Sequence, residues 1–202
     1  RSGDTVRLVD LLDEAVNRME SSLKERIDGG TANITVDEVH KVAEAIGYGA
    51  VKFFDLSRNP TSNYKFSYDQ MLDLKGKTAV YLLYAYARLH SICTKALNDH
   101  NVDVSKLIAD KTPISLGHPS ERNLAFNLLQ FSDTMSVTLE DLFPYHICDY
   151  LYNLSIAASD FVTQCKVLGS PEMKSRLILC RATTMAMREC FDLLAIRDVD
   201  RI

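Results

Sequence analysis

The sequence predicts an all-α fold, and three observations lead to this prediction. Apolar residues recur at intervals of three and four over most of the 202 residues, the spacing of one helix face. The alternation typical of a strand is limited to one short run, Tyr64, Phe66 and Tyr68. Capping and turn residues stand between the periodic segments. No internal repeat is present, and no run of about 18 apolar residues that could span a membrane.

Each periodic segment predicts one helix. The limits follow from the first and last residues of each apolar stripe and from the Pro and Gly residues that flank it. We expect helices from about Thr5 to Ile27, from Thr35 to Phe53, from Thr78 to Leu97, from Val104 to Asp110, from Pro119 to Phe131, from Asp133 to Leu142, from Pro144 to Cys165, and a last one that carries Leu177 to Leu194.

Two details of the second helix are informative. Thr35 and Glu38 form a capping-box pattern, in which each side chain accepts a hydrogen bond from the other residue's backbone amide. Gly47 and Gly49 lie inside the helical pattern, where each destabilises the helix by about 1 kcal/mol relative to Ala. We therefore expect another backbone to approach closely at these two positions.

The segment from Arg58 to Lys77 has no helical period. Asn59–Asn63 is rich in turn-forming residues, and the alternation of Tyr64, Phe66 and Tyr68 suggests an extended piece. Long compact loops of this kind often carry function.

Composition narrows the function classes. Apolar residues make up 47% of the chain, which is enough for a packed core, and the net charge is −4. This charge argues against a general nucleic-acid coat, but a small contact surface that stacks bases remains possible. Five scattered cysteines without a C-x-x-C pair predict core-filling thiols and a reducing, cytoplasmic setting. The chain begins mid-pattern without a signal peptide and therefore looks like the cut end of a longer protein.

No catalytic or metal-binding motif is present. The sequence contains neither a phosphate-binding glycine loop nor an H-E-x-x-H pair. The five histidines lie far apart, without metal-ligand spacing, so we expect them at the surface or at helix caps. By itself the chain does not read as an enzyme, and it predicts no metal.

One helix face could carry chemistry. Tyr81, Tyr84 and Arg88 are spaced i, i+3, i+7 and share one face. Two rings and a guanidinium on one face can stack on splayed bases and hold a phosphate. The same residues could equally pack in a core, with the Arg88 stem running past the two rings. Spacing alone leaves both interpretations open.

The ordered motif around this face resembles class I arginyl-tRNA synthetases. Asp55–Asn59 matches the D-L-S-x-N element, Tyr64–Leu72 the Y-x-F-x-aromatic-D-x-M-L loop, and Gly76–Arg88 the G-N-T-A-x-Y-L-x-Y-A-x-x-R helix start. Lys77 replaces the usual asparagine. Leu83 stands where bacterial members have glutamine, which resembles the cytosolic eukaryotic branch.

The flanks extend the resemblance along the chain. Arg1–Leu8 resembles the residues after the family's lysine-containing signature loop, and His146–Leu154 resembles the long helix of the DALR anticodon-binding domain. Arg176–Ala182 resembles its last helix. Ala195 replaces the glycine of the family's D-x-L-G-I ending, so a left-handed helix cap there would be lost or strained. Ile202 falls where family members end, and we expect it to be the carboxy-terminus, near the anticodon.

The resemblance implies a C-terminal part of an arginine–tRNA ligase. Residues 1–30 would be the end of the catalytic signature loop and a connector helix, and residues 31–202 the anticodon-binding helical bundle of class I synthetases. The partner would be tRNA(Arg), and the missing N-terminal catalytic domain in the same chain would use ATP with Mg, while this part holds no cofactor. The implied tRNA-binding residues are Asn59, Tyr64, Phe66, Tyr68, Tyr81, Tyr84 and Arg88, with Tyr150, Tyr152 and Ile202 as weaker candidates.

Two other functions fit the same composition. The chain could be a helical protein–protein interaction module, which would need no Asp55–Arg88 motif and would not bind tRNA. It could also be part of a catalytically inactive synthetase paralogue, a question that only the sequence before Arg1 decides.

Overall fold

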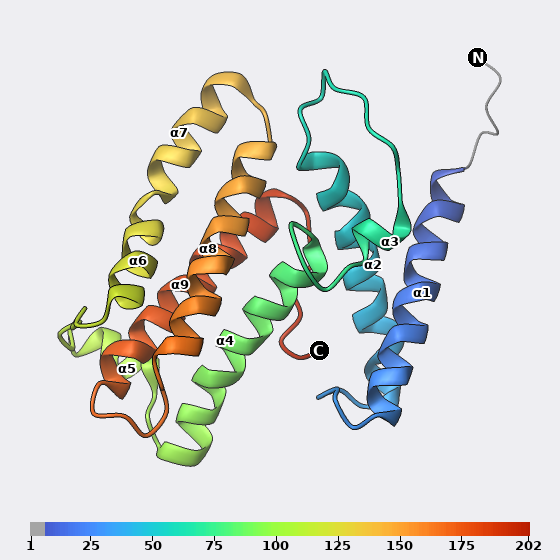
Figure 1. The fold of residues 1–202 in the computed structure, drawn as a ribbon. Coiled ribbons are helices and arrows are strands. Elements are labelled where there is room, and N and C mark those ends of the chain that lie inside the picture. Colours follow the sequence, from blue (N-terminus) through green and yellow to red (C-terminus); the bar gives the residue numbers. More distant parts are fainter. Residues whose placement is uncertain (1–6) are drawn as a thin grey trace.

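The predicted all-α fold is confirmed. The computed structural model describes residues 7–202, and the regular elements of this part are all helical (Figure 1). They are α1 (Leu8–Asp28), the 3-10 turn η1 (Val36–Glu38), α2 (Val39–Leu56), α3 (Tyr68–Met71), α4 (Ala79–His100), α5 (Val104–Ala109), α6 (Pro119–Leu129), α7 (Phe131–Asp141), α8 (Tyr145–Gln164) and α9 (Met173–Leu193). None of these helices is long and apolar enough to cross a bilayer.

The helices form two groups that meet at α4. Helices α1 and α2 pack side by side, and α6 to α9 form a bundle on the other side of α4 (Figure 1). Helix α4 contacts α2, α8 and α9, so it lies at the centre of the molecule. The face of α4 that none of these helices covers therefore lies between the α1–α2 pair and the α6–α9 bundle.

The α1–α2 contact explains Gly47. A Cβ atom at Gly47 would lie 3.0 Å from the Val16 backbone nitrogen of α1, so only glycine lets the two helices approach this closely. The predicted backbone approach is confirmed there. At Gly49 the close neighbour is instead a side chain, with the Ile196 Cγ2 atom 3.0 Å from where the Cβ would be.

Local capping sets several helix starts. Thr35 and Glu38 form the predicted capping box, with the Thr35 amide donating to Glu38 Oε2 at 2.9 Å. Thr78 caps α4, because its hydroxyl accepts a hydrogen bond from the Tyr81 amide at 3.2 Å. His118 caps α6 through its Nδ1 atom, which confirms one expected capping histidine.

Some predicted boundaries differ from the structure. The segment Tyr64–Ser67 forms no strand, and Tyr68 already begins α3, because the aromatic side chains pack on neighbouring helices rather than on a sheet. Helix α4 continues one turn beyond Leu97 and ends where Asn101 adopts a left-handed φ of 53°. Helix α7 begins at Phe131 instead of Asp133. The predicted start of the first helix, Thr5, lies outside the described residues.

The core is built around large apolar side chains from α2, α4, α8 and α9. Phe53, Tyr86, Phe161 and Phe191 are all at most 1% exposed. Four of the five cysteines are buried as predicted, and burial raises the pKa of the Cys148 thiol to about 12. These thiols therefore act as small apolar groups at neutral pH.

One ion pair is buried within the bundle. Arg176 of α9 donates to the Glu121 carboxylate of α6 at 2.7 Å, and the Glu121 side chain is only 2% exposed. Burial alone would raise the pKa of Glu121, but hydrogen bonds from the His118 amide and from Arg176 outweigh it and lower the pKa. Apolar periodicity gives no signal for such a pair.

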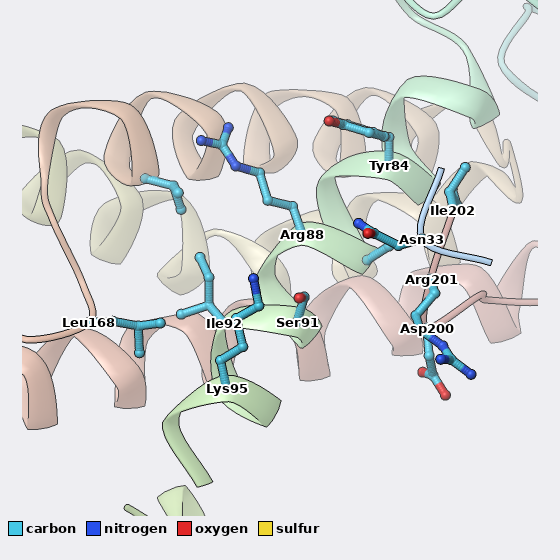
Figure 2. A pocket seen from close by; sticks show the side chains of 12 residues that line it. Asn33, Tyr84, Arg88, Ser91, Ile92, Lys95, Leu168, Asp200, Arg201 and Ile202 are labelled. Carbon is cyan, nitrogen blue, oxygen red and sulfur yellow. The ribbon is translucent and has the colours of Figure 1, made fainter. Parts of the chain in front are cut away.

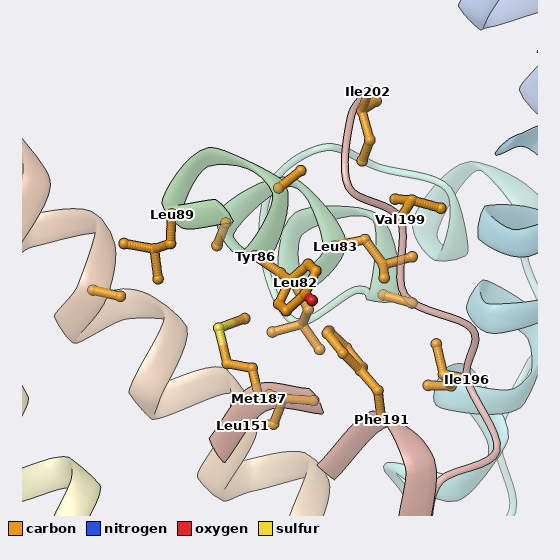
Figure 3. Close-up of a cluster of buried hydrophobic side chains, with 14 of the residues drawn as sticks. Leu82, Leu83, Tyr86, Leu89, Leu151, Met187, Phe191, Ile196, Val199 and Ile202 are labelled. Carbon is orange, nitrogen blue, oxygen red and sulfur yellow. The ribbon is translucent and has the colours of Figure 1, made fainter. Parts of the chain in front are cut away.

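The segment after α9 turns back along the core. Ala195 has a left-handed φ of 53°, the Ile196 amide donates to the Phe191 carbonyl at 2.8 Å, and the Ala195 amide to the Asp192 carbonyl at 3.1 Å. These two bonds are those of a Schellman cap. The left-handed cap is thus kept with alanine in the glycine position. Figure 3 shows Ile196, Val199 and Ile202 of this segment lying along the core cluster of α4 and α9.

Candidate nucleic-acid interface

A cavity lies on the free face of α4. It has a volume of about 620 Å³, and we call it the α4 groove (Figure 2). Residues of α4, the end of α8 and its following loop, the α1–α2 connection and the last three residues form it. Its lining residues are Asn33, Tyr84, Ala87, Arg88, Ser91, Ile92, Lys95, Val162, Leu168, Asp200, Arg201 and Ile202.

Tyr84 and Arg88 of the predicted face both line this groove. The Tyr84 ring is 45% exposed, and the Arg26 guanidinium of α1 lies 6.0 Å from its centroid. Arg88 is also exposed, and within residues 7–202 its guanidinium has no carboxylate partner. An exposed ring beside a free guanidinium can stack a base and hold a phosphate.

Tyr81 belongs to the same helix face but points toward α8. Its hydroxyl donates to Ser159 Oγ at 3.2 Å, and its ring packs edge-on against Tyr152 at 5.9 Å between centroids. Both rings are half-buried. Of the three residues on the predicted face, Tyr84 and Arg88 thus lie together in the groove. Tyr81 lies outside it and pairs with Tyr152.

The chain end closes one side of the groove. The Asn33 amide donates to the Ile202 carbonyl at 3.3 Å, and the Ile202 side chain is only 6% exposed. Arg201 donates to Glu38 at 2.9 Å, and Asp200 lies 3.6 Å from His90. Ile202 thus lies beside the α4 face, but it presents little side-chain surface.

A partly buried hydrogen-bond clamp holds this end in place. Arg188 of α9 donates to the Tyr86 hydroxyl at 2.6 Å and to Asp198 Oδ2 at 2.8 Å. Burial and the adjacent Asp198 carboxylate raise the pKa of Tyr86 well above its usual value. Burial alone would raise the pKa of Asp198, but its hydrogen bonds with Tyr86 and Arg188 lower it. The clamp fixes the direction in which the last residues leave α9.

The aromatic loop lies apart from the groove. Tyr64 donates its hydroxyl hydrogen to Asp55 at 2.6 Å, and this bond with burial raises the pKa of Tyr64. The Arg58 guanidinium lies close to both rings of the T-shaped Phe54–Tyr64 pair, at 4.3 and 4.7 Å from their centroids. Phe66 packs edge-on against Phe54 at 5.7 Å. These residues form an interlocked cluster on α2, with Tyr64 still 40% exposed.

Tyr68 extends this cluster to α1. Its hydroxyl donates to the Leu11 carbonyl at 3.3 Å, and the Arg18 guanidinium lies 4.7 Å from its ring centroid. Arg26, the neighbour of Tyr84, follows Arg18 by two turns of α1, or about 12 Å. The aromatic loop and the α4 groove are therefore neighbouring but distinct surfaces.

The remaining candidates have structural contacts. The Asn59 side-chain oxygen accepts hydrogen bonds from the Thr61 amide and hydroxyl at 2.9 and 2.7 Å, which shapes the turn. The Tyr150 ring is only 5% exposed and packs against Phe131, so any part that it plays in RNA binding is indirect. Lys77 pairs with Asp149 of α8.

Sequence reasoning missed several groove residues. Lys95 lies seven residues after Arg88, so continuing the predicted face by two turns would have found it. Asn33 and Leu168 come from loops, and their place in the groove depends on the packing of distant helices. Within the described part of the chain, no group of three side chains could hold a metal ion.

Comparison with known proteins agrees with this geometry. The model of the DALR anticodon binding domain matches residues 82–202, and that of the class I tRNA synthetase (R) catalytic domain matches residues 1–68. Two arginine–tRNA ligases of Arabidopsis thaliana match the whole chain: the chloroplastic/mitochondrial form is 48% identical and the cytoplasmic form 46%. The chain covers only 30% and 33% of their lengths.

A solved structure shows the same fold. Arginyl-tRNA synthetase of Plasmodium falciparum superposes with a TM-score of 0.84 at 31% identity, over 98% of this chain and 34% of that one. The chain spans about a third of the length of the relatives that it matches. Because the DALR model covers more than half of its residues, the chain belongs to the DALR anticodon-binding domain family.

Proposed function

We propose that the chain is the C-terminal part of an arginine–tRNA ligase and binds the anticodon arm of tRNA(Arg) in the α4 groove. One observation carries this proposal: the groove places the exposed Tyr84 ring beside the free Arg88 guanidinium, within the matched family region. A base splayed from the anticodon loop would stack on the ring, and the guanidinium would hold a phosphate or a base edge.

The other candidate residues take supporting parts in this proposal. Tyr64, Phe66 and Tyr68, with Asn59 in the adjoining turn, form a second aromatic surface next to the groove, where the exposed side of Tyr64 can meet another part of the same RNA. Tyr81, Tyr150 and Tyr152 support α4 and α8 from within, and Ile202 seals the groove at the chain end.

The chemistry would take place in the part of the enzyme that precedes this chain. There, a catalytic domain would join arginine to tRNA(Arg) through arginyl-adenylate, using ATP with Mg. In this division residues 1–30 connect the catalytic domain to the anticodon-binding unit, residues 31–202, with α1 between them. The present residues would position the tRNA and would hold no cofactor.

We also assign the enzyme to the cytosolic eukaryotic branch, with a cytoplasmic location. Leu83 supports this assignment, because an apolar residue at this buried position of α4 resembles that branch, whereas bacterial members have glutamine there. The relatives include both organellar and cytoplasmic forms, so fluorescence microscopy of the tagged full-length protein is the test. An organellar signal would overturn the assignment.

A gel-shift titration tests the main proposal. The 202-residue chain should bind tRNA(Arg) more tightly than a non-cognate tRNA of equal length at the same salt concentration. Equal affinity for both would contradict anticodon recognition. If the folded chain shifts neither tRNA, a helical protein–protein interaction module becomes the better account.

A further inference from the structure

We propose that the α4 groove follows the RNA strand beyond the stacked base and that Lys95 contacts a second backbone phosphate. This inference rests on the proposed function and adds a subsite to it. The ligand class is a single-stranded ribonucleotide segment, bound at this subsite through its phosphate and not through its base.

The first support is the placement of Lys95. It follows Arg88 by seven residues on α4, which is two turns, or about 10 Å along the helix. Tyr84, Arg88 and Lys95 thus form one line along the groove floor. Figure 2 shows the Lys95 side chain reaching back along α4 toward Arg88, into the groove.

The second support is the charge of the groove. Among its lining residues, Arg201 already donates to Glu38 at 2.9 Å, and the one acid, Asp200, lies 3.6 Å from His90. Arg88 and Lys95 are exposed, and within the described residues neither has a carboxylate partner. Two free cations in line therefore remain for an anionic strand, although the chain as a whole is acidic.

The third support is the shape of the groove. Between the two cations lies Ser91, whose hydroxyl can donate to a phosphate oxygen, and the facing wall is made by Val162 and Leu168. The volume of about 620 Å³ is that of a site for a small ligand, so a strand fits where a duplex would not. An ammonium group is a point charge and carries no base preference.

The salt dependence of tRNA(Arg) binding tests this inference. The logarithm of the association constant falls linearly with the logarithm of the salt concentration, and removing one phosphate contact to a single strand makes this slope less steep by about 0.7. We expect Lys95→Gln to show this change, with about a 2- to 5-fold loss of affinity that is similar for cognate and non-cognate tRNA. Lys106→Gln is the matched control, because Lys106 is an exposed lysine of α5 outside the groove.

The outcomes separate the two proposals. If Arg88→Gln weakens binding but Lys95→Gln has the slope and affinity of Lys106→Gln, the second phosphate contact is refuted and the proposed function stands. If the unaltered chain does not bind tRNA(Arg), the proposed function itself fails. Circular dichroism of each variant confirms that the helices are unchanged. A change of slope with Lys95→Gln alone supports the subsite.

Discussion

Replacing Ala195 by glycine should stabilise the protein. Ala195 is exposed and holds a left-handed φ of 53° at the Schellman cap of α9. The left-handed conformation destabilises the folded state by about 1–2 kcal/mol for a residue with a Cβ, but not for glycine. Glycine also makes the unfolded chain more flexible, which destabilises the folded state by about 0.4–1 kcal/mol and offsets part of this gain. Because no buried contact of the methyl group is lost, the net gain is about 0.5–1 kcal/mol.

Urea denaturation followed by circular dichroism measures this gain in the free energy of unfolding. In a thermal melt of a chain of this size, a gain of about 1 kcal/mol corresponds to a rise in melting temperature of about 2–4 °C. The matched control is Ala182→Gly, the same change inside α9 at a right-handed position, which should destabilise by about 1 kcal/mol. If both changes destabilise equally, the cap at Ala195 is not strained and the reasoning is refuted.

Three further predictions concern packing and charge. Gly47→Ala should destabilise by about 1–3 kcal/mol, because the new Cβ would meet the Val16 backbone at 3.0 Å, and an unchanged thermal melt would contradict the close helix contact. Glu121→Gln should destabilise the folded state by about 3 kcal/mol at pH 7, because it leaves the largely buried Arg176 with only the more exposed Glu172 carboxylate, at 3.4 Å, as a charge partner. The pKa of Glu121 is lower in the folded state than its usual value of 4.5. The ionised carboxylate therefore adds to the free energy of unfolding above pH 4.5, and this stabilisation is lost as the pH falls through the folded pKa. The free energies of unfolding of the two proteins, measured by urea titration, should converge at low pH. Asp198→Asn should loosen the clamp, weaken tRNA(Arg) binding and leave the helical content unchanged, and a filter-binding assay that gives unaltered affinity would exclude a positioning role.

Local chemistry made most of the fold predictable. Apolar stripes, the capping box at Thr35 and Pro119 at the start of α6 are signals within a few residues, and the structure keeps each of them. The extended piece predicted for Tyr64–Tyr68 ends at Ser67, just before α3 begins, and it pairs with no strand, because alternation in a short loop cannot show whether the rings meet a sheet or neighbouring helices.

The candidate site was predictable only along one helix. Tyr84 and Arg88 share a face by spacing, but their exposure depends on what covers α4, which the sequence left open. The other walls of the groove are set by long-range packing: Leu168 follows α8, and Ile202 arrives through the turn at Ala195. Tyr81 shows the limit of spacing, because α8 covers it although it lies on the same face.

The most direct measurement of the central claim is the affinity of Tyr84→Ala for tRNA(Arg). Stacking of one base is worth about 1–3 kcal/mol, so this variant should bind about 5- to 150-fold more weakly with unchanged helical content. Phe126→Ala is the matched control, because Phe126 is a 61% exposed ring on α6 outside the groove, and it should bind like the unaltered chain. Equal affinities of the two variants, or an unfolded Tyr84→Ala protein whose folded fraction binds normally, would contradict the account.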